Sequence, residues 1–354
     1  MGTIIIHAGR PKAGSTTVQR WIAEQAGALR KRDVAVLVAK RDPDKPAKRF
    51  TLRDYESRGL NSGIVVRRYV GSGREPGILE RFVSQLDASA SNHETVVVSS
   101  EAFASLFVDA DPALLDPLEQ LARSHHVRVA YYVRPQHSAF EAMWRQYGFR
   151  EEVEPVDYFE RCRAQHDYWA TLQAVRSRAP GVSFEVRPFR NDLLVGRHVA
   201  TDFASTFLSA ADLFSWIPTT WENRGLPLEL TNALRFAPRG LFWEHAHDNA
   251  TLRRLQELFG GVEPRADGRT RRSRSILRAH CRSVFGPGNA RLVSELGWAT
   301  ESFVAPVGDE LVEPWDLREL DELWRPVASS GELDLLFRAL ETLVADGSPV
   351  EAHT

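Results

Sequence analysis

The chain has 354 residues, and its 45 lysine and arginine residues nearly balance 47 aspartate and glutamate residues, which leaves a net charge of −2. This balance argues against binding of nucleic acids or of polyanions in general through the overall charge of the protein. With 43% hydrophobic and 26% charged residues, the composition is that of a globular protein with a large core and excludes extensive disorder.

The pattern along the chain alternates buried strands with helices. Uninterrupted β-branched and aromatic runs predict strands covered on both faces, at Thr3–Ala8, Val34–Val38, Thr95–Ser99, Val127–Val133 and Val182–Val186. Helical spacing follows at Ser15–Arg32, Ile78–Leu86, Pro112–His125, Ser138–Phe149, Val156–Ser177 and His198–Leu208. We expect Arg41–Arg53 and the basic segment Arg265–Arg274 to be polar loops.

Beyond about residue 210 only helical patterns remain, at Leu226–Phe236, Leu241–Leu258, Ser275–Val284, Asn289–Leu296 and Leu333–Ala345. The alternation predicts a doubly wound α/β fold, with a mainly five-stranded parallel sheet flanked by helices and a largely helical C-terminal third. We expect one domain over residues 1–354, in which 1–210 form a nucleotide-binding sheet core and 211–354 a helical extension.

The two cysteines, Cys162 and Cys281, lie far apart and form no CxxC or Cys/His cluster, so we expect neither a disulfide framework nor a zinc site. A reducing, cytoplasmic setting fits this usage best. The longest apolar runs are far shorter than the roughly 20 residues that span a bilayer, so we expect no transmembrane segment, and no secretion signal is recognisable.

The most informative segment is the loop that reads His-Ala-Gly-Arg-Pro-Lys-Ala-Gly-Ser-Thr-Thr over residues 7–17, where the first strand turns into the first helix. Backbone N–H groups of such a loop and the positive end of the helix bind anions, while Ser15 and Thr16 add donors and Lys12 a charge. The loop predicts a phosphate or sulfate site; a glycine turn that only starts the helix is the alternative. It is not a Walker A motif, because Lys12 precedes Gly14 by two residues.

At these residues the chain resembles the sulfotransferases that use 3′-phosphoadenosine 5′-phosphosulfate, particularly bacterial ones. Their phosphosulfate loop, Pro-Lys-x-Gly-Thr-Thr, matches residues 11–16 with Ser15 in place of the first threonine, and Gln19 agrees as well. Weaker matches follow in family order, at Ser99–Glu101, Tyr132–His137, Val186–Phe189, Asp202–Phe203 and Asn223–Arg224, so the resemblance covers about residues 3–296. It implies a cofactor site made of Arg10, Lys12, Ala13, Gly14, Ser15, Thr16, Thr17, Arg134 and Ser138, with no metal ion required.

Arg134 ends the fourth predicted strand, where the family binds the 3′-phosphate of the cofactor; a sheet-edge ion pair is the alternative. The family motif places a serine eight residues later, but this chain has Ala142. Ser138 stands one turn earlier, and its spacing from Glu141 favours a helix capping box over a phosphate contact. The basic segment Arg269–Arg274 is another candidate to close over the 3′-phosphate, or else a solvated loop.

Sulfuryl transfer needs a base for the attacking hydroxyl and a cation at the leaving phosphate oxygen. The resemblance implies that Glu101, which follows the third predicted strand, is the base, although a helix cap would explain a glutamate there too. Lys12 supplies the cation. His7 is a second candidate for lining the catalytic site, or a hydrogen-bonded histidine at a strand end.

Two other features are weaker candidates. His245 and His247, with Glu244, suggest a metal cluster, but residues two apart on a helix point to different sides. Trp144 and Trp221 fit core packing better than an acceptor cleft.

The sequence therefore predicts a sulfotransferase that acts on a hydroxyl acceptor, with a carbohydrate or glycolipid suggested by the resemblance. Its partners would be a small-molecule or glycan acceptor and no nucleic acid. A P-loop nucleotide enzyme of the kinase type, or a degenerate nucleotide-binding member without turnover, are the alternatives. The oligomeric state cannot be read from the chain.

Overall fold

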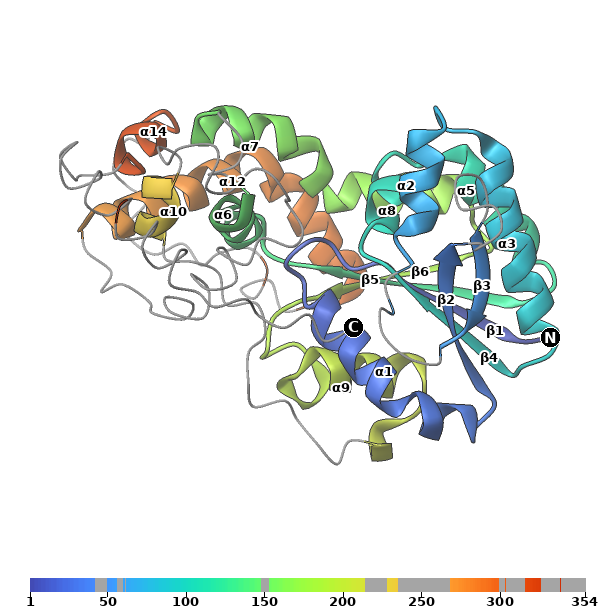
Figure 1. The fold of residues 1–354 in the computed structure, drawn as a ribbon. Coiled ribbons are helices and arrows are strands. Elements are labelled where there is room, and N and C mark those ends of the chain that lie inside the picture. Colours follow the sequence, from blue (N-terminus) through green and yellow to red (C-terminus); the bar gives the residue numbers. More distant parts are fainter. Residues whose placement is uncertain are drawn as a thin grey trace. The chain divides into compact units, whose positions relative to one another are not determined.

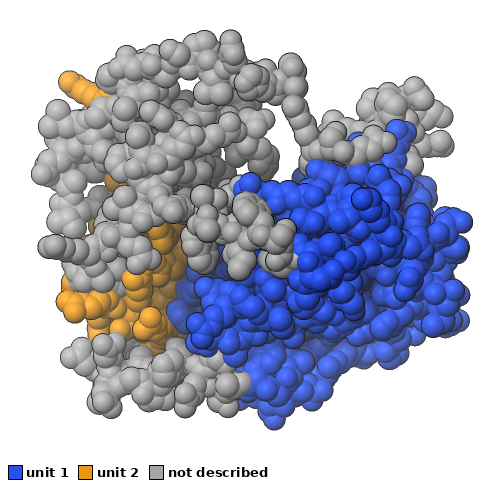
Figure 2. All heavy atoms as spheres, turned by 90° about the horizontal axis from the view of Figure 1, so that it is seen from below, with its two compact units in different colours: residues 1–139, 163–220, 284–306 blue, residues 140–162, 221–283, 307–354 orange. Residues whose placement is uncertain are grey.

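The computed structural model of the protein describes residues 1–41, 50–55, 60, 62–147, 153–213, 228–234, 268–298, 303, 316–325 and 338. The chain divides into two compact units, which are described separately (Figure 2). Unit 1 comprises residues 1–139, 163–220 and 284–306, and unit 2 comprises residues 140–162, 221–283 and 307–354.

Unit 1 contains a six-stranded sheet with the order β3-β2-β4-β1-β5-β6 (Figure 1). Its strands are β1 (Thr3–His7), β2 (Val34–Arg41), β3 (Phe50–Asp54), β4 (Thr95–Ser99), β5 (His126–Val133) and β6 (Ser183–Pro188). All pairings are parallel except that of β3 with β2. The predicted α/β fold with five parallel strands is confirmed, with one antiparallel edge strand added.

That sixth strand corrects the prediction of a polar loop at Arg41–Arg53. β2 continues to Arg41, and β3 pairs with it in a register that sets Arg41 opposite Phe50 and Leu37 opposite Asp54. An edge strand has one unpaired side and carries charged side chains, so it lacks the continuous apolar run that marks the inner strands.

Helices cover both faces of the sheet in unit 1 (Figure 1). The helices α1 (Ser15–Arg30) and α9 (Val199–Phe207) pack on one face through a core that includes Val18, Ile22 and Phe203. The opposite face carries α2 (Ile64–Gly71), α3 (Pro76–Ala90), α4 (Phe103–Val108), α5 (Pro112–Leu121) and α8 (Tyr168–Arg178). Alternate residues of β1 enter the two cores, Ile4 and Ile6 one and Ile5 the other, which explains its unbroken apolar sequence.

The helix predicted over Val156–Ser177 is interrupted. It forms α7 (Pro155–Arg163), the 3-10 turn η2 (Ala164–His166) and α8. Asp167 causes the break, because its backbone is not helical and its side chain accepts a hydrogen bond from the Ala170 amide to cap α8. The short helices α2 and α4 were not predicted; each is close to the length of two turns, too short for a clear apolar period.

Unit 2 is built from helices around an aromatic core. Its helices include residues 140–147 of α6 (Gln136–Tyr147), most of α7, α10 (Leu228–Leu234) and α14 (Glu319–Leu323). Trp144 is fully buried, lies 5.6 Å from the Trp324 ring and donates its indole N–H to Asn232. The interpretation of Trp144 as a core residue is confirmed; Trp221 lies outside the described residues.

One helix, α12 (Gly268–Leu296), replaces the basic loop and the two separate helices expected between residues 265 and 296. It runs through Pro287, so the Gly286-Pro287-Gly288 sequence does not end it. Burial of Ile276 and Leu277 in the first half and of Leu292 and Val293 in the second outweighs the low helix propensity between them.

In the described part of the chain, every regular element after residue 210 is helical, as predicted. No helix of that part is long and apolar enough to cross a membrane. The predicted helices at Leu241–Leu258 and around Leu333–Ala345 fall outside the described residues, apart from residue 338.

Candidate functional site

The parallel strands of the unit 1 sheet all end at its carboxyl edge, where the chain connections that follow them begin. After β1 the chain runs through α1 toward β2, whereas after β5 it returns on the other face toward β6, so neighbouring strands send their connections in opposite directions. Ligands of open α/β sheets bind at such a switch point. The loop after β1 and Arg134 after β5 meet there, because the Arg10 amide donates to the Tyr132 carbonyl oxygen over 2.8 Å.

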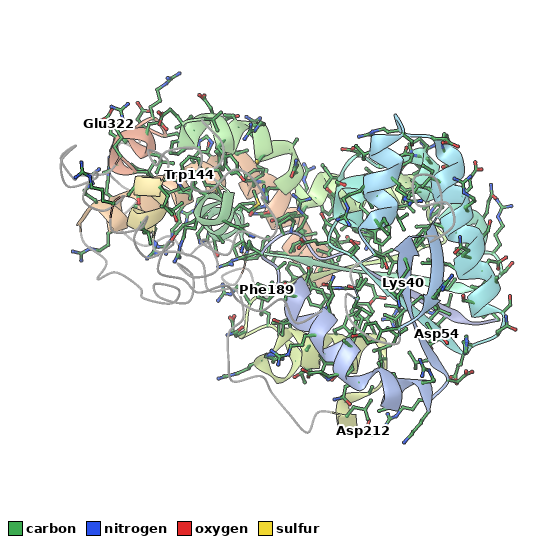
Figure 3. The ribbon with its side chains drawn as sticks, viewed as in Figure 1. Lys40, Asp54, Trp144, Phe189, Asp212 and Glu322 are labelled. Carbon is green, nitrogen blue, oxygen red and sulfur yellow. The ribbon has the colours of Figure 1, made fainter. Side chains whose placement is uncertain are left out.

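At two positions of the loop, only glycine fits without a steric clash. A Cβ atom on Gly9 would lie 2.7 Å from the Ser15 hydroxyl oxygen, and one on Gly14 would lie 2.5 Å from Cε2 of Phe189. Gly14 also has φ +81°, a conformation that side chains disfavour. Phe189 (Figure 3), the first residue after β6, therefore packs directly on the start of α1.

We predict that Gly14→Ala costs about 2–4 kcal/mol of unfolding free energy, through about 1 kcal/mol of backbone strain and the remainder from the clash with Phe189. Gly73→Ala is the matched control, since Gly73 has φ +74° but open space around its Cα atom. Urea denaturation of both variants measures the difference. Equal losses would show that Phe189 moves aside at no cost.

The first turn of α1 offers hydrogen-bond donors without an internal cap. Gly14 makes no side-chain capping bond, and no acidic residue lies in the first turn. The Ser15 side chain is buried, and its hydroxyl oxygen has no partner among the described residues. Thr16 is exposed and Thr17 half-buried in the same turn. An anion would accept hydrogen bonds from the free amides of this first turn and from the Ser15 hydroxyl.

Lys12 stands in the loop with φ +66°, which is unusual for a residue with a side chain. Its carbonyl oxygen accepts from Nη1 of Arg134 at 3.4 Å, so the loop after β1 and the end of β5 are tied together. Ala13 is fully buried beneath the loop, and its amide donates to the Arg10 carbonyl oxygen over 3.0 Å. The predicted cofactor residues from Arg10 to Gly14 thus form the turn after β1, and Ser15 to Thr17 form the first turn of α1.

Glu101 lies beside this turn. The Ser100 amide donates to the His7 carbonyl oxygen over 3.0 Å, which brings the connection after β4 to the end of β1. Burial raises the pKa of Glu101, and the charges of Lys12 and Arg10 oppose that shift. The alternative role of Glu101 as a helix cap is not supported, since Ala102 is the N-cap residue of α4 and its amide donates to the Ser100 hydroxyl over 3.1 Å.

His7 is buried below the loop. Its Nδ1 atom lies 2.7 Å from the Ser99 hydroxyl, which also accepts from Nε2 of Gln19, and its ring meets Tyr132 and Phe203 edge-on. Burial lowers the pKa of His7 to about 3. Of the two candidate bases, Glu101 is the one that solvent can reach and whose raised pKa improves its basicity.

Arg134 and Ser138 are joined, which corrects the prediction of a capping box. The Ser138 hydroxyl accepts from Nε of Arg134 at 2.6 Å, and Ser138 is the third residue of α6, inside the helix instead of before it. Glu141, its supposed partner, pairs with Arg274 within unit 2 at 2.8 Å. The bond to Ser138 orients the guanidinium, whose Cζ atom lies 6.0 Å from the centre of the Phe189 ring.

The basic segment Arg269–Arg274 forms the first turns of α12 and has partners inside unit 2. Arg272 pairs with Glu319 at 3.0 Å, and Arg269 donates to the carbonyl oxygens of Glu322 and Leu323. The prediction of a loop is therefore wrong, since these arginines hold α12 against α14. His245, His247, Glu244 and Asn223–Arg224 lie outside the described residues.

The sequence did not reveal the buried network behind α9. Asp202 is fully buried, pairs with Arg187, and accepts from the Tyr132 hydroxyl at 2.7 Å and from the Val195 amide at 2.9 Å. The signal was present as isolated matches, an arginine after Val186 and an aspartate before Phe203, but nothing local indicated that they meet. This network fixes α9 against β5 and β6, next to the residues that carry the loop.

Nor did the sequence single out Gln165 and His166, which lie in η2. The Gln165 side-chain oxygen accepts from Nη2 of Arg10 over 3.1 Å, and the Arg10 charge contributes to lowering the pKa of the buried His166. Arg10 is only 2% exposed, the buried Tyr131 hydroxyl lies within its hydrogen-bonding reach, and it forms no ion pair among the described residues. A buried cation without a paired anion favours an anionic ligand nearby.

A comparison of the chain with protein-family models, curated proteins and solved structures finds no match. Among the described residues, no group of three histidine, cysteine, aspartate or glutamate side chains could hold a metal ion.

Proposed function

We propose that the protein is a sulfotransferase that moves a sulfuryl group from 3′-phosphoadenosine 5′-phosphosulfate to a hydroxyl of an acceptor. One observation carries the proposal. The carboxylate of Glu101 lies within electrostatic reach of Lys12 and Arg10, beside the start of α1, where the buried Ser15 hydroxyl has no partner in the part of the chain that the structure describes. A base, a cation and anion donors are the parts that sulfuryl transfer needs.

The residues at this site fit 3′-phosphoadenosine 5′-phosphosulfate, the sulfuryl donor. The amides at the start of α1 and the Ser15 hydroxyl suit its 5′-phosphosulfate, and Gly9 keeps the space beside Ser15 open. Arg134, oriented by Ser138, suits the 3′-phosphate, because a guanidinium bonds two phosphate oxygens at once. When bound, the donor supplies an activated sulfuryl group.

In this proposal Glu101 takes the proton of the attacking acceptor hydroxyl. As the bond from the acceptor oxygen to sulfur forms and the bond from sulfur to the phosphate oxygen breaks, Lys12 stabilises the negative charge left on that oxygen. No metal ion is required, since Lys12 and the amides of α1 supply the positive potential. A carbohydrate or glycolipid is the acceptor class that we propose.

The test begins with binding. We predict that adenosine 3′,5′-bisphosphate binds without metal and about tenfold or more tightly than AMP, because an arginine contact to a charged oxygen is worth about 1.5–3 kcal/mol. Arg134→Ala should remove this preference while AMP affinity stays. Isothermal titration calorimetry of both nucleotides measures it.

Further variants separate the sources of the preference. Ser138→Ala should reduce it less than Arg134→Ala does, because only the orienting bond is lost. Ala142→Ser, which restores the hydroxyl of the family motif, should tighten the bisphosphate by up to about tenfold. Stronger binding of ATP with Mg²⁺ would instead favour a kinase-type enzyme, and equal binding of AMP and the bisphosphate would favour a nucleotide-binding protein without a 3′-phosphate site.

A further inference from the structure

Two buried polar atoms lie beside Gly9 in the loop after β1. A Cβ atom at Gly9 would lie 2.7 Å from the Ser15 hydroxyl oxygen and 3.5 Å from Nε2 of His7, so both atoms face the same point next to the Gly9 Cα atom. Neither has a hydrogen-bond partner among the described residues, and the Ser15 and His7 side chains are only 5% and 0% exposed. Buried polar atoms are almost always hydrogen-bonded, so two unpaired ones at one place indicate a bond that ligand binding completes.

The bonds on the other side of the His7 ring determine which nitrogen carries the proton. His7 and Ser99 are register partners in the parallel strands β1 and β4, and Nδ1 of His7 lies 2.7 Å from the Ser99 hydroxyl oxygen. That oxygen accepts from Nε2 of Gln19 over 3.1 Å. The Ser99 hydrogen therefore goes to Nδ1, which accepts it. Burial lowers the pKa of His7 to about 3, so the ring holds one proton at neutral pH, and this proton is on Nε2.

His7 and Ser15 then have complementary requirements. Nε2 of His7 donates, and the Ser15 hydroxyl oxygen has lone pairs that can accept from it. The opposite direction is excluded, because Nε2 already carries a hydrogen. Rotation of the Ser15 side chain between staggered positions changes the separation of the two atoms. Once Ser15 accepts from His7, its own hydrogen is left for an anion at the start of α1.

The resulting series of hydrogen bonds begins and ends on α1. Gln19 and Ser15 stand four residues apart on this helix and thus on the same face. Gln19 donates to Ser99, Ser99 donates to His7, and His7 donates to Ser15. Hydrogen bonds in series polarise one another, so each of them makes the Ser15 hydroxyl a stronger donor.

We propose that His7 is a positioning residue, which directs the hydrogen of the Ser15 hydroxyl to the 5′-phosphosulfate of the donor. The bond from Nε2 to the Ser15 oxygen forms when the anion takes that hydrogen. This inference rests on one part of the proposed function, a 5′-phosphate group at the start of α1. Ser15 contacts the ligand, whereas His7 acts through Ser15 and is neither the base nor a contact of the acceptor.

The test is a double-mutant cycle on nucleotide affinity with the full chain. AMP and adenosine 3′,5′-bisphosphate share the 5′-phosphate, and we expect His7→Asn to weaken both by about threefold to tenfold, the value of one hydrogen bond between neutral groups. Asparagine keeps a polar atom near the Nδ1 position for Ser99 but has none at Nε2. In a Ser15→Ala background, His7→Asn should have no further effect, because the hydroxyl that it serves is gone. Isothermal titration calorimetry of the four proteins measures the coupling.

Two further variants separate positioning from packing. His7→Gln places an amide nitrogen near the Nε2 position and should recover most of the affinity that His7→Asn loses. His125→Asn is the matched control, since His125 is also buried but pairs with Asp87 at 2.9 Å and accepts from the Gly2 amide at the amino edge of the sheet. It should leave both affinities unchanged. Unaltered affinity in His7→Asn, or equal losses with and without the Ser15 hydroxyl, would overturn the inference.

If His7→Asn does not fold, nuclear magnetic resonance of the protein labelled with ¹⁵N-histidine decides. His7 is identified by its proximity to the rings of Tyr132 and Phe203, which it meets edge-on. Its proton should reside on Nε2, and adenosine 3′,5′-bisphosphate should shift this signal in the wild type but not in Ser15→Ala. A proton on Nδ1, or a signal that saturating bisphosphate leaves in place, would contradict the positioning role.

The outcome does not depend on turnover, so the two proposals can fail separately. Coupling between His7 and Ser15 without any sulfuryl transfer would support the positioning role and count against the sulfotransferase. Transfer without this coupling would remove the role of His7 and leave the proposed reaction intact. Failure of both nucleotides to bind would overturn the two together.

Discussion

Replacing Glu101 by glutamine should reduce kcat by about a hundredfold to ten-thousandfold, the usual contribution of a general base. The amide has the shape of the carboxylate but cannot take a proton from the acceptor. Affinity for adenosine 3′,5′-bisphosphate should stay close to that of the wild type. In this proposal Glu101 contacts the acceptor and not the bisphosphate, and Ala102, not Glu101, is the N-cap residue of α4. Release of the bisphosphate from the donor, followed under saturating conditions, measures the loss.

The pH profile gives an independent check of the same residue. Burial raises the pKa of Glu101, so the acidic limb of kcat/KM should lie above the usual range of a glutamate. A base works only when deprotonated, and activity therefore falls as pH drops through that pKa. Glu24→Gln, a change on the exposed face of α1, serves as the control. Normal turnover by Glu101→Gln, with an unaltered acidic limb, would remove Glu101 from the mechanism.

Replacing Lys12 by alanine should lower kcat by about a hundredfold to a thousandfold, the loss typical of one electrostatic donor in a preorganised site. Lys12 is the cation of the loop itself, and the Ser15 hydroxyl and α1 amides that remain are neutral. Removing this charge also removes the larger of the two cationic influences that oppose the raised pKa of Glu101, so the residual activity should have its acidic limb at still higher pH.

Lys31→Ala is the control for this variant, because Lys31 is exposed at the opposite end of α1. Both proteins should unfold at similar urea concentrations, since Lys12 is half-buried in a loop and not in either core. Activity of Lys12→Ala within a few fold of the wild type would contradict the role given to the loop.

The sequence alone was sufficient for the parallel strands and for the place of the loop. Continuous apolar runs such as Thr95–Ser99 identify strands with two covered faces, because the period of burial is a local property of the chain. Glycines, a proline and hydroxyl residues after β1 likewise predict a turn into a helix. The edge strand β3 and the interruption before Asp167 escaped prediction, because one depends on pairing with β2 and the other on a single capping contact.

The tertiary structure decided which side chains of that region can act together. The chemistry of the loop could be predicted from the sequence. The burial of His7, the bond from Arg134 to the Lys12 carbonyl oxygen and the bond from Arg10 to Gln165 could not, because they join residues from separate elements. Such contacts depend on how the strands order themselves and on which face each helix covers. Local spacing determines the period and the turns of a chain, whereas the partners of a buried polar group are set by packing between distant segments.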